Sequence, residues 1–254
     1  MSFNVPIYAP LHDQFKFDAA ALKLELDQKA RPVLQERTLS FKNERSIYDP
    51  KGSLKIADDE LLNDTSRYIE HEDGSRDYVA GKYKTYHALN ACWLPEEPDS
   101  EFNIYRFDDP KKTIFWHQYM KPFTWREEFI DGPLYKAVMQ FPWEYIQGVR
   151  VLCMDPPSIG QAHKDSATLA NKKFFSRGHA SISFNVDHGG GILKYLDDSE
   201  KDHEVDNDVR VFHFDDSAPH GVTPITSRRY QVRMWGKLAV PYTELMDLDR
   251  AVWR

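Results

Sequence analysis

Three His-x-Asp pairs are the residues of this sequence whose types and spacing could do chemistry: His71-Asp73, His163-Asp165 and His213-Asp215. Residues i and i+2 of a β-strand point to the same face, so such a pair sets an imidazole beside a carboxylate. A second histidine from elsewhere in the fold would complete the 2-His-1-carboxylate triad that binds non-haem Fe(II) and leaves coordination positions open. Because the chain has 10 histidines and 40 acidic residues, one or two pairs are expected by chance, and their position must decide.

Only the middle pair stands in a context that suits such a triad. It follows a stretch that has the pattern of a strand, and about fifty residues of strand-like sequence come after it. His220 then lies between two strand signals and can supply the second imidazole. We therefore predict that His163, Asp165 and His220 are the metal ligands and form the catalytic centre.

The other two pairs lack this context. The first pair could combine with His117, but no run of alternating strands separates them. The third pair has only His220 downstream, and a spacing of seven residues leaves no room for an intervening sheet. We expect both pairs to make polar surface or loop contacts.

A second chemical feature is the run "RRYQVRMW" at 228–235, which alternates as a strand does. An arginine on its inward face is costly to bury unless it meets an anion, and a dicarboxylic acid would supply one. Arginine holds a carboxylate in a bidentate geometry that lysine does not reproduce, so we predict Arg229 as the anchor, with Arg228 as the alternative if the register shifts by one. If Arg229 points inward, its face also carries Gln231, Arg233 and Trp235, while the opposite face carries Tyr230, Val232 and Met234.

The elements that must position these residues are short strands in the second half of the chain. Their apolar and polar residues alternate, and Gly, Pro and Asp clusters separate them. Several short strands at such spacing indicate an antiparallel sandwich or barrel. The predicted strands cover residues 145–155, 179–187, 191–198, 209–216 and 228–240.

Two helices are predicted upstream of these strands. Asp18 precedes "AAALKLELDQKA" as an N-cap, and Arg31-Pro32 should end that helix. The run "DGPLYKAVMQF" at 131–141 predicts a second helix, opened by Pro133 near its first position. Residues 36–130 contain many charged and aromatic residues and turn signals, and their topology cannot be traced.

Composition indicates a soluble globular chain of 254 residues, expected to form a single domain over 1–254. Its net charge of −7 argues against a broad basic surface for nucleic acid or an anionic membrane. The sequence starts without a leader pattern, lacks a run long enough to span a membrane, and has only two cysteines, Cys92 and Cys153. We therefore expect a cytoplasmic protein with buried thiols and a small-molecule substrate. The sequence does not reveal the oligomeric state.

Residues 145–240 resemble the 2-oxoglutarate- and Fe(II)-dependent oxygenases, most closely their prolyl-hydroxylase-like and small amino-acid hydroxylase branches. The resemblance depends on the predicted ligand triad, on "GGGILKYL", and on "PHGVTPITSRRYQVRMW", in which a basic residue opens the last strand nine residues after the distal histidine. It implies an α+β fold with a double-stranded β-helix (jelly-roll, cupin-like) core over 145–240. An N-terminal extension of helices, short strands and lid elements (1–144) would pack around this core, and 241–254 would form a C-terminal tail.

The same resemblance implies Fe(II), 2-oxoglutarate and O2 as requirements, with Arg229 on the 5-carboxylate of 2-oxoglutarate. The polar face of the 179–187 strand, with Ser183 and Asn185, would line the cofactor pocket, although relatives often have a larger residue than asparagine there. Arg233 would lie deeper, on the 1-carboxylate or on an acidic group of the substrate. Trp235 and Gln231 are the predicted substrate contacts.

The expected activity is hydroxylation, or a related oxidation, of a small polar metabolite such as an amino acid, with release of succinate and CO2. Oxidation of a protein side chain is the second hypothesis, and it would need an open groove. The third hypothesis is a non-redox, metal-binding cupin-like protein. Arg229, after the distal histidine, argues against it, because a zinc hydrolase does not need a buried arginine there.

Overall fold

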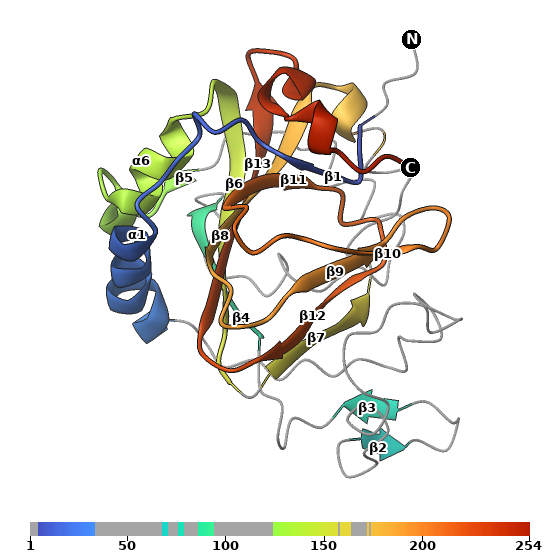
Figure 1. Cartoon of the computed structure of the whole chain (residues 1–254). Helices are drawn as coiled ribbons and strands as arrows, with labels where there is room; N and C mark the ends of the chain where they lie inside the picture. Colours follow the sequence, from blue (N-terminus) through green and yellow to red (C-terminus); the bar gives the residue numbers. More distant parts are fainter. Residues whose placement is uncertain are drawn as a thin grey trace.

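Antiparallel β-sheets and a few short helices form the described part of the chain (Figure 1). The computed structural model describes residues 5–33, 68–70, 76–78, 86–93, 124–156, 158–163, 172 and 174–254. The larger sheet has the strand order β1-β11-β8-β13-β6-β4-β5, the second has the order β10-β9-β12-β7, and β2 pairs with β3 alone. Among the described helices, none combines the length and the apolar character that a membrane crossing requires.

The seven-stranded sheet contains the longest strands. In order across the sheet, its seven strands are β1 (Tyr8–Pro10), β11 (Val211–Phe214), β8 (His179–Asp187), β13 (Arg229–Leu238), β6 (Trp143–Met154), β4 (Tyr86–Trp93) and β5 (Thr124–Trp125). The predicted strands at 145–155, 179–187, 209–216 and 228–240 are therefore confirmed as β6, β8, β11 and β13. The strong alternation of these runs is what made them recognisable.

The four-stranded sheet contains three strands that the sequence did not predict. It consists of β10 (Asp202–Glu204), β9 (Leu193–Leu196), β12 (His220–Ile225) and β7 (Ser158–His163), and the separate pair is β2 (Tyr68–Glu70) with β3 (Arg76–Tyr78). Only β9 was expected, within 191–198. His220 therefore begins a strand and does not lie between two strands, and Pro224 and two register shifts against β7 hide the alternation of β12.

The helices α1 and α6 lie together on one side of the seven-stranded sheet, on the left in Figure 1, whereas the helical turns near the C-terminus lie at the top. The helical elements in chain order are α1 (Ala19–Glu25), the π-helical turn η1 (Leu26–Ala30), the 3₁₀ turns η2 (Arg31–Val33) and η4 (Glu127–Phe129), α6 (Pro133–Met139), and near the C-terminus the 3₁₀ turns η5 (Tyr242–Leu245) and η6 (Leu248–Arg250).

Local sequence explains where both α-helices begin. The side chain of Asp18 accepts a hydrogen bond from the backbone N–H of Ala21 (3.0 Å), which confirms the predicted N-cap. Pro133 occupies the first turn of α6, where its missing N–H costs nothing. The predicted first helix differs in its second half, because after Glu25 the chain widens into η1 before it reaches Arg31-Pro32.

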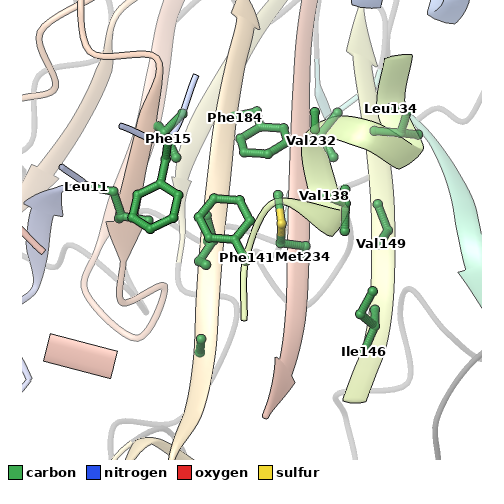
Figure 2. Close-up of a cluster of buried hydrophobic side chains, with 14 of the residues drawn as sticks. Leu11, Phe15, Leu134, Val138, Phe141, Ile146, Val149, Phe184, Val232 and Met234 are labelled. Atoms are coloured by element: carbon green, nitrogen blue, oxygen red, sulfur yellow. The ribbon is translucent and has the colours of Figure 1, made fainter. Parts of the chain in front are cut away.

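A large hydrophobic cluster lies between the seven-stranded sheet and this helical layer. Figure 2 shows Phe184, Val232 and Met234 from β8 and β13 beside Val138 of α6 and Phe141 just after it. Tyr230 lies two residues before Val232, on the same face of β13, and is also fully buried in this cluster. The predicted outward face of the 228–235 run is thus confirmed.

A second cluster lies between the two sheets. It packs side chains of the seven-stranded sheet, such as Met154 and Phe212, against Leu193, Tyr195 and Val222 of the four-stranded sheet. The seven-stranded sheet is therefore covered on both faces, by helices on one and by the second sheet on the other. A polar group on its inner face is shielded from water unless a pocket opens there.

Segments outside the predicted core region also join the structure. The strands β1, β4 and β5 belong to the seven-stranded sheet, and Val252 exchanges backbone hydrogen bonds with Tyr8. The division of the chain at residues 144 and 240 stays a prediction. Cys153 is a buried free thiol, as expected, and burial raises its pKa to about 12, whereas the side chain of Cys92 lies outside the described residues.

Candidate metal and anion site

The two predicted histidine ligands lie directly opposite each other in the four-stranded sheet. In the antiparallel pairing of β12 with β7, His220 is in register with His163. Directly opposed positions in such a pair lie on one face, with Cβ atoms about 4.5–5.5 Å apart. The side chain of His163, and all of Asp165, lie outside the described residues. The structure therefore brings two of the three predicted ligand positions together.

The imidazole of His220 is prepared to act as a ligand through Nε2. Its Nδ1 lies 2.9 Å from the carbonyl oxygen of Ala218, and since a carbonyl only accepts, Nδ1 must carry the proton. Nε2 is then the basic nitrogen, and a backbone carbonyl behind the ring is the usual partner of a metal-binding histidine. The ring is buried and packs edge-on against Phe214, at a centroid distance of 5.1 Å. The donor chemistry of this side chain therefore fits a divalent metal.

Within the described residues no three His, Cys, Asp or Glu side chains gather into a metal site. This observation does not reach the predicted triad, because two of its three side chains lie outside that part of the chain.

A pocket opens between the two sheets beside His220. Its polar lining among the described residues consists of His220, Arg229, Gln231 and Arg233, and none of the described lining residues is acidic. The other described lining residues are apolar or glycine, namely Leu152, Met154, Gly160, Leu193, Phe214, Gly221 and Val222. A mostly apolar pocket with a few convergent cationic and hydrogen-bonding groups suits a small anionic ligand.

Arg229 is the buried cation of this pocket. Only 3% of its surface is exposed, and its backbone lies opposite Met154 of β6. Among the described residues its Nη1 finds no hydrogen-bond acceptor, although Arg229 makes other interactions. A guanidinium in the wall of a pocket can hold a carboxylate in a bidentate contact, so this placement fits a carboxylate ligand.

The structure separates Arg229 from the alternative, Arg228. Arg228 extends on the other side of the strand, where its Nε donates to Asp155 (2.7 Å) and its Nη1 donates to Asp27 (3.0 Å). It does not line the pocket. Of the two arginines, Arg229 is therefore the one placed to bind a ligand there.

The polar face of β8 lies beside the pocket but does not line it. Ser183 and Asn185 are buried and in register with Arg233 and Gln231 of β13. Neither is among the described lining residues. Because both are buried, this face is not exposed to solvent, as it would be in a simple sandwich.

A cationic group continues along the inner face of β13. Arg233 donates to Asp216 (2.5 Å), and its guanidinium lies 5.7 Å from the ring centre of Trp235. Arg150, which is opposite Arg233 in register, lies 5.3 Å from the same ring. Trp235 also packs partly against the large hydrophobic cluster and does not line the pocket.

Sequence reasoning missed Arg150 and Asp216. The alternation of the 145–155 run places residue 150 on the same face as Leu152 and Met154, and this pattern was available. Asp216 had no such signal, because its pairing with Arg233 depends on β8, which pairs with β11 on one side and with β13 on the other.

The prediction for His213 is wrong in one respect. His213 lies fully buried in β11, not on the surface, and its ring nitrogens bond to the hydroxyl of Tyr242 (2.9 Å) and the carbonyl oxygen of Pro6 (2.8 Å). A buried histidine is accommodated here because the fold supplies both partners, which the local sequence does not reveal. The pair His71-Asp73 and His117 lie outside the described residues.

Burial lowers the pKa of His213, which makes a prediction about pH. Below about pH 6.5 the unfolded chain protonates this histidine while the folded protein resists it, so stability is complete above that pH and falls below it. His213→Gln should remove up to about 1.4 kcal/mol per pH unit of this decline. Urea unfolding of both proteins from pH 5 to 8 measures the difference, and identical slopes would contradict the assignment.

The comparisons with known proteins find similar solved structures only. No protein-family model and no curated protein matches the chain. A prolyl-4-hydroxylase from Pseudomonas putida is 20% identical at a TM-score of 0.28, with 42% of this chain and 61% of that chain covered. A 2OG-Fe(II) oxygenase family oxidoreductase from Burkholderia pseudomallei is 13% identical at a TM-score of 0.31, with 59% and 68% covered.

A protein of another class is also similar. The capsular polysaccharide assembling protein CapF from Staphylococcus aureus is 13% identical at a TM-score of 0.25, with 37% of this chain and 25% of that chain covered. The matched part spans about three fifths of the Pseudomonas protein and a quarter of CapF. Since these TM-scores lie below 0.5, the function proposed below depends on the residues of the site.

Proposed function

We propose that this protein is an Fe(II)- and 2-oxoglutarate-dependent oxygenase of the prolyl-hydroxylase-like or small amino-acid hydroxylase type, built on a double-stranded β-helix core. The observation that carries the proposal is the presence of His220 and the buried Arg229 in one pocket, with His163 in register opposite His220. This arrangement joins a position for a metal to a position for a carboxylate.

His163, Asp165 and His220 would hold the metal. The Nδ1 hydrogen bond of His220 fixes the tautomer that presents Nε2. Together with 2-oxoglutarate and O2, bound Fe(II) supplies the oxidising power to hydroxylate a C–H bond, with succinate and CO2 as co-products. The chain itself contributes orientation, charge placement and exclusion of water.

Arg229 would bind the 5-carboxylate of 2-oxoglutarate in a bidentate contact. Gln231 lines the same pocket two residues further along β13 and can donate a hydrogen bond to the ligand. Ser183 and Asn185 would support these side chains from the neighbouring strand β8, with which they are in register.

The substrate proposed is a small polar metabolite such as an amino acid. Arg233 also lines the pocket and would bind an acidic group of the substrate in exchange for its contact with Asp216. Trp235, beside Arg150 and Arg233, would contact the rest of the substrate. Oxidation of a protein side chain is the alternative within the same chemistry.

The experiment that tests this function is anaerobic. Fe(II) and then 2-oxoglutarate are added to the metal-free protein, and the weak visible charge-transfer band of the chelate is recorded. A band that saturates with 2-oxoglutarate supports the oxygenase, and succinate release then serves to screen amino acids. Fe(II) binding without a band would overturn the proposal in favour of a non-redox, cupin-like metal-binding protein.

A further inference from the structure

A network of ion pairs surrounds the start of β13 on the face opposite the pocket. Asp155 accepts from Arg228 Nε through Oδ1 (2.7 Å) and from Arg31 Nη2 through Oδ2 (2.5 Å). Asp27 Oδ1 accepts from Arg228 Nη1 (3.0 Å) and from the hydroxyl of Tyr230 (2.7 Å). Two carboxylates thus hold two guanidinium groups and a buried phenol.

Three residues of this network are close neighbours of Arg229. Arg228 directly precedes it, Tyr230 follows it on β13, and Asp155 follows Met154, the residue in register with it on β6. Side chains alternate along a strand, so Arg228 and Tyr230 point to the face opposite the Arg229 side chain. Their contacts therefore restrain the Arg229 backbone from that opposite face. The direction of the pocket cation therefore depends on contacts made outside the pocket.

The N-terminal helix is distorted at the point where it reaches this network. The backbone N–H of Arg31 donates to the carbonyl of Leu26, an i to i+5 bond that closes the π-helical turn η1. Asp27 lies within this turn and Arg31 directly after it, and both make network contacts. Single π-helical turns are rare and occur frequently at functional positions, because they aim side chains that a regular helix would aim elsewhere.

A turn at Gly189 contacts the residues that precede Arg229 in the chain. The carbonyl of Gly189 accepts from the backbone N–H groups of Thr226 (2.8 Å) and Ser227 (3.1 Å). Gly189 has φ 61°, and a Cβ there would lie 2.5 Å from the carbonyl oxygen of Ser227 and 3.1 Å from Cβ of Arg229. The turn that leads into β13 is therefore packed closely against Gly189.

We infer that Asp27 and Asp155 are positioning residues for the cosubstrate site: together with Arg228 and Arg31 they tie the N-terminal helix to the start of β13 and so fix the guanidinium of Arg229. This inference rests on the proposed function. A misplacement of about 1 Å at a binding group can cost about 100-fold in a reaction. Loss of one carboxylate, with Arg229 retained, should raise the half-saturating 2-oxoglutarate concentration by roughly 5- to 30-fold.

The test compares Asp155→Asn and Asp27→Asn with the unaltered protein in the anaerobic titration of the Fe(II) complex with 2-oxoglutarate. Both variants should need more 2-oxoglutarate and still reach the full band at saturation, and their turnover at saturation should be unchanged. The matched control is Glu144→Gln, which breaks the ion pair with Lys237 (2.6 Å) at the opposite end of β6 and β13. This control should bind 2-oxoglutarate as the unaltered protein does.

Two results would overturn the inference alone. One is an unchanged half-saturation in both aspartate variants, and the other is an equal rise in Glu144→Gln, which would indicate general loosening of the two strands. Absence of the band in the unaltered protein would instead overturn the proposed function, and the positioning role with it.

Discussion

Replacing His220 with alanine should abolish the Fe(II)–2-oxoglutarate band and lower turnover at least about 100-fold, since loss of a residue that merely supports a metal ligand already costs 10- to 100-fold. The physical reason is specific to one atom. With Nδ1 donating to Ala218, Nε2 is the nitrogen that can bind the metal, and alanine offers no replacement. Fe(II) affinity, measured by titration, should fall with the activity.

A matched histidine separates this effect from a general loss of stability. His203 lies in β10 of the same four-stranded sheet, pairs with Asp197 (2.7 Å) and stacks on Tyr195. His203→Ala should therefore bind Fe(II) and turn over normally. Circular dichroism should show native structure in both variants. Normal Fe(II) affinity in a folded His220→Ala protein would remove His220 from the metal site.

The sequence predicted the parts of this site that depend on local pattern. The alternation of 228–235 predicted which residues of β13 face the helices and which face inward, and the pocket contains Arg229, Gln231 and Arg233 as a result. A strand has a period of two, so one well-placed residue determines the direction of its neighbours. Trp235 lies beside Arg150 and Arg233, as the alternation predicts, but it does not line the pocket.

Other features depend on pairing between distant segments and could not be predicted. The register of His220 with His163 arises where β12 meets β7, and neither strand has clear alternation because glycines and Pro224 interrupt them. The burial of His213 depends on Pro6 and Tyr242, which lie far away along the chain. Hydrogen-bond partners of this kind come only from the tertiary fold.

The choice between Arg228 and Arg229 shows why the fold is needed. The sequence alone leaves it open, because a shift of one residue exchanges the two faces. The structure resolves the placement through carboxylates upstream of the strand, since Asp27 and Asp155 engage Arg228 on the outer side. The acidic residues that direct the pocket cation thus come from the first helix and from the end of β6.

Replacing Arg229 with methionine, which keeps much of the side-chain volume, should raise the half-saturating 2-oxoglutarate concentration roughly 30-fold or more. Truncating one member of a buried, hydrogen-bonded charge pair costs about 2–5 kcal/mol, and 2 kcal/mol corresponds to about 30-fold in affinity. Arg229→Lys should give a smaller loss, because lysine keeps the charge and loses the bidentate geometry. The anaerobic titration used for the unaltered protein measures both.

The two substitutions at this pocket should fail in different ways, and the difference identifies the roles. Arg229→Met should still bind Fe(II) with ordinary affinity and approach normal turnover when 2-oxoglutarate is raised far enough, because the metal ligands are intact. His220→Ala should not recover at any 2-oxoglutarate concentration. If Arg229→Met instead saturates at the normal concentration, the buried guanidinium serves the fold, and another cation of the pocket, with Arg233 the first to test, must bind the carboxylate.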